Sequence, residues 1–166
     1  MSTVDSASYR KPGPLVRWAF NPMVVGLIRL GISVKGSRIL EVKGRSTGLA
    51  RRTPVNLLRH GGQEYLVAPR GNTQWVRNVR AGDGRITLVL GRRRWERLAT
   101  EVPEGEKLEV LRAYLRNWNA EAGVFFEGLG ADSPESELAR ISPHHPVFRL
   151  SDPREAAGAV PGDAGR

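Results

Sequence analysis

The alternation of apolar and polar residues predicts a chain built mainly from short strands. Six segments carry apolar residues at strand-like spacing between turn-forming residues: 38–44, 52–60, 63–69, 85–91, 93–102 and 146–150. Most of them follow one another closely enough to form hairpins. Five or six strands joined in this way, with helices at the edges, favour an antiparallel β-barrel decorated by helices.

Helical spacing is clearest in residues 106–118, where apolar side chains recur every three or four positions. A short helix is predicted after Asn72 or Thr73, either of which can serve as its N-cap. Another is predicted to begin at Ser133, because Pro134 suits a first helical turn. The expected fold class is therefore mainly β, with flanking helices.

The apolar segment 14–32 predicts one helix, or two short ones broken near Asn21 and Pro22. Polar and charged residues interrupt it, so it is not a spanning helix, which needs about 20 mainly apolar residues. Two interpretations stay open. The helix either plugs one end of its own barrel, which we favour, or residues 15–32 lie on an anionic bilayer between flanking lysines and arginines.

The length of 166 residues suits one domain with a proper core. We expect this domain to cover residues 14–150, with residues 1–13 as a flexible tail and residues 151–166, rich in Ala, Gly and Pro, as a disordered tail. The chain has no cysteine, and no signal peptide is visible. A cytoplasmic protein is expected, either free or associated with a membrane through residues 15–32.

The formal net charge of +9 predicts an anionic partner. Nucleic acid, an acidic membrane surface and a phosphorylated or polycarboxylate small molecule all fit this charge. Arg92, Arg93 and Arg94 could form a nucleic-acid patch, but successive strand residues point to opposite faces, and no nucleic-acid motif accompanies them. We therefore expect no nucleic acid.

The turn between Gly44 and Gly48 concentrates positive charge. Lys43, Arg45, Arg51 and Arg52 surround it, and no acidic residue follows Glu41 in this stretch. Glycines permit close backbone approach, the hydroxyls of the turn are donors, and consecutive turn amides can form an anion-binding nest. The hairpin is either simply well solvated or built to hold an anion.

A second candidate anion site precedes the short helix. Residues 69–72 join a strand end to a helix N-terminus, where backbone N–H groups are unpaired, and Arg70 adds a charge. An ordinary strand-to-helix connection explains the pattern equally well. The adjacent His144 and His145 lie beside prolines in a predicted loop, and we assign no metal to them.

Three stretches in order resemble the deazaflavin-dependent nitroreductase family: KGRSTGLARRTPVNLL, YLVAPRGNTQWVRNVRA, and ITLVL with its returning strand. The resemblance is strong from about Ile39 to Val102 and weaker beyond. It implies a six-stranded antiparallel split β-barrel, as in pyridoxamine-phosphate-oxidase-like, FMN-binding proteins. It also implies that the protein uses the 5-deazaflavin coenzyme F420.

The resemblance also implies a coenzyme site. The GRSTG turn and the strand after it would bind the phosphate and the acidic tail, the next strand end would run along the deazaflavin ring, and the short helix would complete the pocket. These residues are Arg45, Ser46, Thr47, Gly48, Arg51, Arg52, Thr53, Pro54, Ala68, Pro69, Arg70, Gly71, Asn72, Trp75 and Asn78, with Arg80 as a further candidate. Tyr114, on the long helix, is the candidate catalytic residue.

Two departures from the family pattern concern the ring. Relatives commonly have Ser-Lys where this chain has Pro69 and Arg70, and proline removes one N–H donor and one hydroxyl. The loop between the following glycine and Trp75 is also short. Coenzyme binding is therefore better supported by the resemblance than nitroreductase chemistry.

The leading hypothesis is an oxidoreductase that transfers hydride from reduced coenzyme F420 to an electron-poor small molecule, such as an enone, a quinone or a nitro compound. One alternative keeps the barrel but binds FMN, or acts as a non-catalytic carrier of a cofactor or lipid. A remote alternative is a basic module for nucleic acid or a membrane surface. A homodimer is a further possibility.

Overall fold

The computed structural model describes residues 22–33 and 35–158. The predicted tail 1–13 and residues 14–21 of the predicted N-terminal helix lie outside these ranges. Within them, no helix is both long and apolar enough to cross a bilayer.

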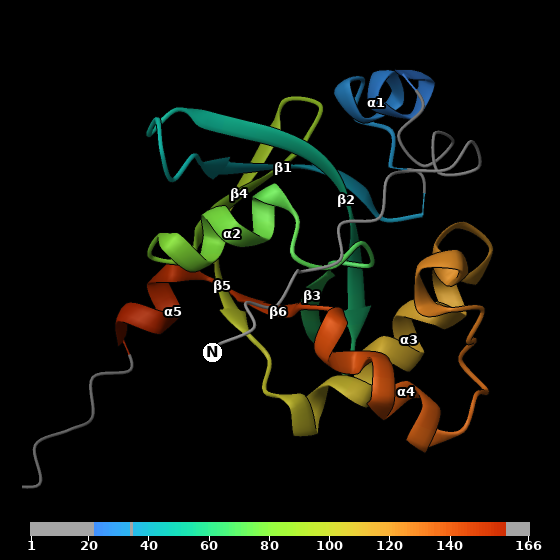
Figure 1. The fold of residues 1–166 in the computed structure, drawn as a ribbon. Coiled ribbons are helices and arrows are strands. Elements are labelled where there is room, and N and C mark those ends of the chain that lie inside the picture. The colour runs from blue at the N-terminus through green and yellow to red at the C-terminus, as the bar shows by residue number, and fades with distance from the viewer. Residues whose placement is uncertain (1–21, 34, 159–166) are drawn as a thin grey trace, which may run out of the picture.

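The centre of the structure is a closed six-stranded antiparallel barrel (Figure 1). Its strands follow the spatial order β1-β2-β3-β6-β5-β4, and β1 pairs with β4 to close it. Their bounds are β1 Ser37–Lys43, β2 Ala50–His60, β3 Gln63–Val67, β4 Arg85–Leu90, β5 Arg93–Glu101 and β6 Val147–Ser151. The predicted fold class, six strands in hairpins with flanking helices, is confirmed.

Alternate strand residues fill the barrel interior. Leu40 and Val42 of β1, Leu66 of β3, Leu88 of β4 and Phe148 of β6 are all buried and belong to one apolar cluster. Because side chains alternate across a strand, the residues between them face outward. Full burial of one aromatic or aliphatic side chain stabilises the folded state by about 1.5–3 kcal/mol. The apolar periodicity of the strands is therefore explained by the burial of this cluster.

A second apolar cluster lies between the barrel and the helices that follow β5. These helices are α3 Glu104–Ala122, the 3-10 helix η1 Gly123–Phe126, α4 Glu135–Ile141 and the 3-10 helix η2 Ser142–His144. Helix α3 is longer than the predicted 106–118 and is kinked at Trp118, whose φ of −130° and ψ of 24° are not helical.

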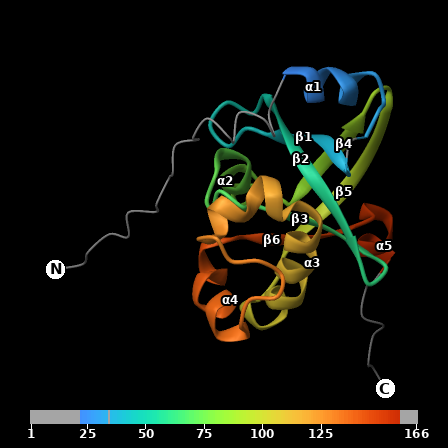
Figure 2. The same cartoon turned by 90° about the vertical axis from the view of Figure 1, so that its right-hand side faces the viewer.

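The remaining helices cover other parts of the barrel. Helix α2, Gln74–Ala81, begins after Thr73 as predicted and buries Val76 and Val79 against the strands. Helix α1, Pro22–Arg29, begins at the predicted break and contacts β1 and β4 at one end of the barrel. The favoured interpretation of a plug stays a prediction, because residues 14–21 lie outside the described ranges. Figure 2 shows α1 above the barrel, with α3 and α4 on the side opposite α5.

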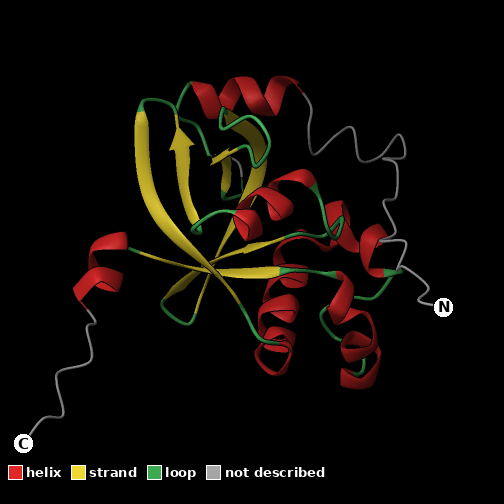
Figure 3. Cartoon of the chain, turned by 60° about the vertical axis from the view of Figure 1, so that its left-hand side comes forward, coloured by secondary structure: helices red, strands yellow, loops and turns green. Residues whose placement is uncertain are grey.

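The prediction that disorder begins at residue 151 is wrong for the described part of this segment. Ser151 ends β6, and helix α5 spans Pro153–Gly158 (Figure 3). The cause is local: the Asp152 carboxylate accepts a hydrogen bond from the Arg154 N–H at 2.9 Å, and Pro153 occupies the first helical position. An N-cap aspartate before a proline is a helix start that the small, apolar composition obscured.

Gly36 offers a test of how tightly the entrance to β1 is packed. It has a φ of 78°, and a Cβ there would lie 2.6 Å from the Leu57 carbonyl oxygen. Gly61 has a φ of 56° but open space around it, so it is a matched control. We expect Gly61→Ala to lower the unfolding free energy by about 1–2 kcal/mol through backbone strain alone.

Gly36→Ala should cost about 1–3 kcal/mol more, because the backbone oxygen cannot move away freely. Denaturant unfolding of both variants measures the difference. Equal losses would show that the contact with Leu57 is unimportant.

Candidate functional site

A cleft of about 660 Å³ opens between the β1–β2 turn, strand β2, the end of β3, helix α2 and the end of α3. This volume is in the range of small-molecule and cofactor sites, about 300–1,000 Å³. Most of the predicted site residues line it: Arg45, Ser46, Thr47, Arg51, Arg52, Thr53, Pro54, Ala68, Pro69, Arg70, Trp75, Asn78 and Tyr114. Gly48, Gly71 and Asn72 do not.

Arg45 connects the β1–β2 turn to helix α2. Its Nη1 donates to Gln74 Oε1 and to Asn78 Oδ1, both at 2.9 Å, and its backbone N–H donates to Asn78 Oδ1 at 3.3 Å. Asn78 is buried, so it is a fixed acceptor. Because both partners are neutral amides, they position the guanidinium without neutralising its charge.

Part of the backbone of the turn closes the hairpin. The N–H of Gly44 donates to Leu49 O at 2.8 Å, and that of Gly48 donates to Gly44 O at 2.8 Å. The N–H of Leu49 donates to Thr47 Oγ1 at 3.3 Å. These three amides close the hairpin turn, and the predicted anion nest at the centre of the turn stays a prediction.

Arg51 and Arg52 differ although they are adjacent. Arg51 lies opposite Val42 in the strand register, and its Nη2 is 3.5 Å from Thr47 Oγ1. Arg52 lies opposite Glu41 and donates to that carboxylate at 2.8 Å. Successive strand residues point to opposite faces. Both residues line the cleft. The guanidinium of Arg52 is paired with the Glu41 carboxylate, whereas that of Arg51 contacts a neutral hydroxyl, so the charge of Arg51 remains available to bind an anion.

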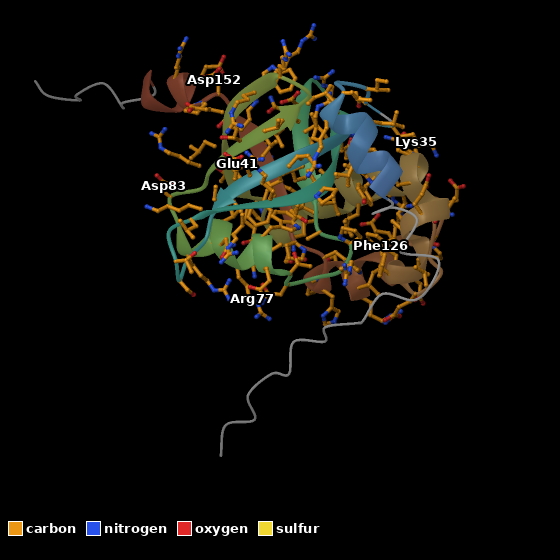
Figure 4. The ribbon with its side chains drawn as sticks, turned by 90° about the horizontal axis from the view of Figure 1, so that it is seen from above. Lys35, Glu41, Arg77, Asp83, Phe126 and Asp152 are labelled. Atoms are coloured by element: carbon orange, nitrogen blue, oxygen red, sulfur yellow. The ribbon has the colours of Figure 1, made fainter. Side chains whose placement is uncertain are left out.

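Glu41 also binds an arginine from a distant strand. Arg94 Nη2 donates to its second oxygen at 2.6 Å, and this hydrogen bond is the main reason that the pKa of Glu41 is lowered. Figure 4 shows Glu41 on the barrel strands and Arg77 on α2, toward the edge of the molecule. Glu41 thus balances the charges of Arg52 and Arg94. The uncompensated positive charge at the cleft is carried by other residues.

The segment after β3 makes a tight turn against the segment before β6. The Ala68 N–H donates to Pro146 O at 2.8 Å, and the Gly71 N–H donates to Ala68 O at 3.0 Å. Gly71 has a φ of 76°, and a Cβ there would lie 3.1 Å from the His144 carbonyl oxygen. Gly71 is therefore turned toward residue 144, which explains why it does not line the cleft.

Asn72 and Arg80 also face away from the cleft. Asn72 Oδ1 accepts a hydrogen bond from Arg80 Nη1 at 3.3 Å, and Arg80 donates to both oxygens of Glu101, at 2.5 and 2.9 Å. The hydrogen bonds to Glu101 raise the pKa of Arg80. Arg80 is thus part of a network that joins α2 to β5, and the prediction that it completes the pocket is wrong.

Aromatic and apolar residues line the other end of the cleft. Tyr114 is 2% exposed, and its ring lies 4.8 Å from that of Trp118 and 6.1 Å from that of Phe126. Burial raises the pKa of Tyr114, while a hydrogen bond with Asn56 opposes this shift. The phenol is therefore protonated at neutral pH, and it can act as a hydrogen-bond donor rather than as a base.

Several lining residues were missed from the sequence. Besides Asn56, they include Gly44, Thr73, Gln74, Glu121, Ala122 and Phe125. Gln74 could have been found, because it lies one helical turn before Asn78. Glu121 and Phe125 continue the spacing of Tyr114 and Trp118 along α3. Asn56 gives no such signal, because its role depends on the pairing of β2 with its neighbours.

His145 supports the turn at residues 68–71 from behind. Its ring is buried and stacked on Phe126, with 4.1 Å between centroids. Burial lowers the pKa of His145 to about 4, and the backbone carbonyls of Pro69 and Ala68 oppose this shift. Among the described residues, no group of three or more His, Asp or Glu side chains could hold a metal ion.

This burial predicts a pH-dependent stability. The folded protein keeps His145 neutral down to about pH 4, whereas the unfolded chain binds a proton below about pH 6.5. Folding stability should therefore fall as the pH drops from 6.5 toward 4, by up to about 3 kcal/mol. His145→Gln should flatten this dependence in denaturant unfolding, and the exposed His144→Gln should not. Parallel pH profiles for all three proteins would contradict the assignment.

The comparisons with known proteins agree with this geometry. A family model described as F420H(2)-dependent quinone reductase matches residues 22–128, more than half of the chain. Comparison with curated proteins found no match.

Three similar solved structures have low sequence identity. A structure of F420-H2 dependent reductase (FDR-A) is 18% identical, covers 70% of this chain and 95% of its own, and has a TM-score of 0.47. A domain-swapped dimer is also 18% identical, covers 82% of this chain and 96% of its own, and has a TM-score of 0.51. A protein of unknown function from Agrobacterium tumefaciens is 16% identical, covers 85% of this chain and 55% of its own, and has a TM-score of 0.51. The last two support the fold.

The family match confirms the resemblance predicted from the sequence. The protein is a reductase whose cofactor is reduced coenzyme F420 and whose substrate is a small-molecule acceptor. This chain belongs to the F420H(2)-dependent quinone reductase family.

Proposed function

We propose that the cleft binds coenzyme F420 with its acidic tail on the β1–β2 turn and reduces a neutral, planar, electron-poor acceptor, in the first place a quinone, at its aromatic end. One observation carries the proposal. Arg45 and Arg51 line a single cleft from the β1–β2 turn and the start of β2, and Tyr114, Ala122 and Phe125 line it from α3 and η1. A molecule with an anionic tail and a flat ring matches this polarity.

The donors at the basic end fit the tail. The coenzyme carries a phosphodiester and a carboxylate-bearing tail, and arginine forms short, charge-assisted hydrogen bonds with both groups. Arg45 is held by two neutral amides, and Arg51 by one hydroxyl. Ser46, Thr47 and Thr53 line the cleft and extend the proposed tail site with hydroxyls, and Arg52 adds charge at longer range. Gly48, which does not line the cleft, shapes the turn that carries them.

The middle of the cleft suits a ring. Pro54, Ala68, Pro69 and Trp75 line it with flat or small apolar surfaces. We expect Arg70, Gly71 and Asn72 to set the shape of the adjoining turn. The Gly71 N–H is bonded to Ala68 O, so polarisation of the ring by this amide is not part of the proposal.

At the aromatic end, the protein excludes water and offers a protonated phenol. When bound, the reduced coenzyme supplies a hydride, and a quinone that takes up this hydride and one proton becomes a hydroquinone as the coenzyme is oxidised. The Tyr114 hydroxyl, which Asn56 orients, can donate a hydrogen bond to an acceptor oxygen. Phe125 and Ala122 supply the apolar wall against which a planar acceptor packs.

The first prediction separates Arg51 from Arg52. Arg51→Gln should weaken binding of oxidised coenzyme F420 by roughly 10- to 100-fold, because a charge-assisted hydrogen bond contributes about 1.5–3 kcal/mol. Arg52→Gln should change binding less than about threefold, because Glu41 already engages that guanidinium. Fluorescence titration measures both, with FMN titrated in parallel as the alternative cofactor. Unchanged affinity in Arg51→Gln, or tighter binding of FMN, would overturn the proposed orientation.

A second prediction concerns the acceptor. With reduced coenzyme, the protein should reduce menadione faster than an enone or a nitroimidazole of similar size, because an apolar cleft with one phenol donor suits a neutral quinone. Tyr114→Phe should lower kcat/KM for menadione by about tenfold while coenzyme affinity stays within about twofold. Turnover of the nitroimidazole alone would favour the nitroreductase alternative instead.

Two finer expectations stay predictions. Membrane contact through residues 15–32 draws support from Leu30 and Ile32, which are exposed directly after α1. Co-sedimentation with anionic vesicles, compared with a Leu30→Ser, Ile32→Ser variant, tests it. The predicted homodimer is tested by light scattering of the purified protein.

A further inference from the structure

One carboxylate interrupts a row of aromatic residues along α3 and η1. Tyr114, Trp118 and Glu121 of α3 and Phe125 of η1 follow one another at spacings of four, three and four residues, and Tyr114, Glu121 and Phe125 line the cleft. Glu121 lies in the last turn of α3, after the kink at Trp118. Among the described residues that line the cleft, Glu121 is the only acidic one.

The charge of Glu121 is held in place from one side. Its Oε1 accepts a hydrogen bond from Lys35 Nζ at 2.8 Å, and the side chain of Glu121 is 17% exposed whereas that of Lys35 is 59% exposed. Lys35 does not line the cleft. The carboxylate is thus the member of the pair that faces a bound acceptor, and the ammonium faces solvent, where its field is screened by water. Figure 4 shows Lys35 near α1, at the edge of the molecule.

The position of Lys35 is fixed by the backbone. Lys35 has a φ of 47°, an uncommon value for a residue with a side chain, and Gly36 follows with a φ of 78°. Gly36 packs against the Leu57 carbonyl and the Trp118 ring, and its own carbonyl accepts the Leu57 N–H at 3.0 Å. Two successive left-handed residues turn the chain so that Lys35 reaches α3. A surface lysine pairing by chance would not need such a backbone.

From these contacts we infer that Glu121 is a specificity-determining residue: its carboxylate makes the aromatic end of the cleft select neutral acceptors over anionic ones, and Lys35 moderates the selection. The inference rests on the proposed function, since it assigns the acceptor to this end. A like charge brought close in a partly desolvated site is strongly disfavoured. The same carboxylate directs the anionic tail of the coenzyme to the opposite, basic end.

A purely structural role makes a different prediction. If the Lys35–Glu121 pair only fastened residues 33–36 to α3, removing the charge would lower stability and affect all acceptors equally. Selection by charge instead changes the ratio between an anionic and a neutral acceptor of similar shape. That ratio is also sensitive to ionic strength, whereas packing is not.

The experiment compares menadione with a naphthoquinone sulfonate of similar size, using reduced coenzyme F420. Glu121→Gln should raise kcat/KM for the sulfonate by about tenfold and change that for menadione less than about twofold. Arg45 and Arg51 are present in both proteins, so their attraction for the sulfonate cancels in the comparison. Glu109→Gln, on the same helix but with an exposed carboxylate that contacts His60, is the matched control and should change neither value.

Lys35→Met should act in the opposite direction, lowering kcat/KM for the sulfonate by about threefold at low salt, with the effect fading as salt is added. An unchanged sulfonate-to-menadione ratio in Glu121→Gln would overturn the inference. An equal rise or fall for both quinones would do the same, since it indicates a structural role.

Binding of the two quinones without coenzyme, followed by quenching of tryptophan fluorescence, separates this inference from the proposed function. Trp75 lines the cleft and serves as the reporter. If Glu121→Gln improves sulfonate binding about tenfold while neither quinone is turned over, the selection stands and the proposed reaction fails. If both quinones are turned over and the binding ratio is unchanged, the reaction stands and the selection fails.

Discussion

Strand β1 is hydrogen-bonded along both of its edges, to β2 and to β4, and the rest of the site depends on this closure. It fixes which residues face inward: Leu40 and Val42 enter the core, and Glu41 faces out toward Arg52 and Arg94. It also fixes where the β1–β2 turn emerges, next to α2, so that Arg45 reaches Asn78. A shift of one residue in this register would turn Arg51 to the other face of β2 and separate Arg52 from Glu41.

The same register separates the features that could be predicted from the sequence from those that could not. Apolar alternation predicted the six strands, and glycine-bracketed turns predicted the hairpins, because both signals are local. The hairpin turn and the segment after β3 were also predicted to belong to one site, although only through the family resemblance. It could not separate Arg51 from Arg52, since that distinction depends on Glu41 and on Arg94, which is 53 residues from Glu41. The contacts of Asn72 and Arg80 could not be predicted either, because they depend on Glu101 of β5, which is 21 residues from Arg80.

The arginines of the cleft differ from several arginines of the outer surface. Outside the cleft, several arginines are paired with acids, as Arg59 and Arg97 are with Glu64. At the cleft, Arg45 and Arg51 contact only amides and a hydroxyl among the side-chain partners in the described residues. Neutral partners fix the direction of a guanidinium without cancelling its field. The excess positive charge of the chain is therefore not spread evenly, and part of it is kept available where an anion can be bound.

The side of the cleft formed by α3 and η1 has no such cations among its described lining residues. There the surroundings are apolar, burial raises the pKa of the Tyr114 phenol, and Glu121 is the one acidic side chain among the described residues that line the cleft. The field along the cleft thus runs from the cations of the β1–β2 turn to the carboxylate of α3. A long molecule that is anionic at one end and flat and neutral at the other has one favourable orientation in such a field. In the proposed binding mode, electrostatics therefore sets the orientation of the coenzyme before any group contacts the ring, and the ring itself needs only walls of the right shape.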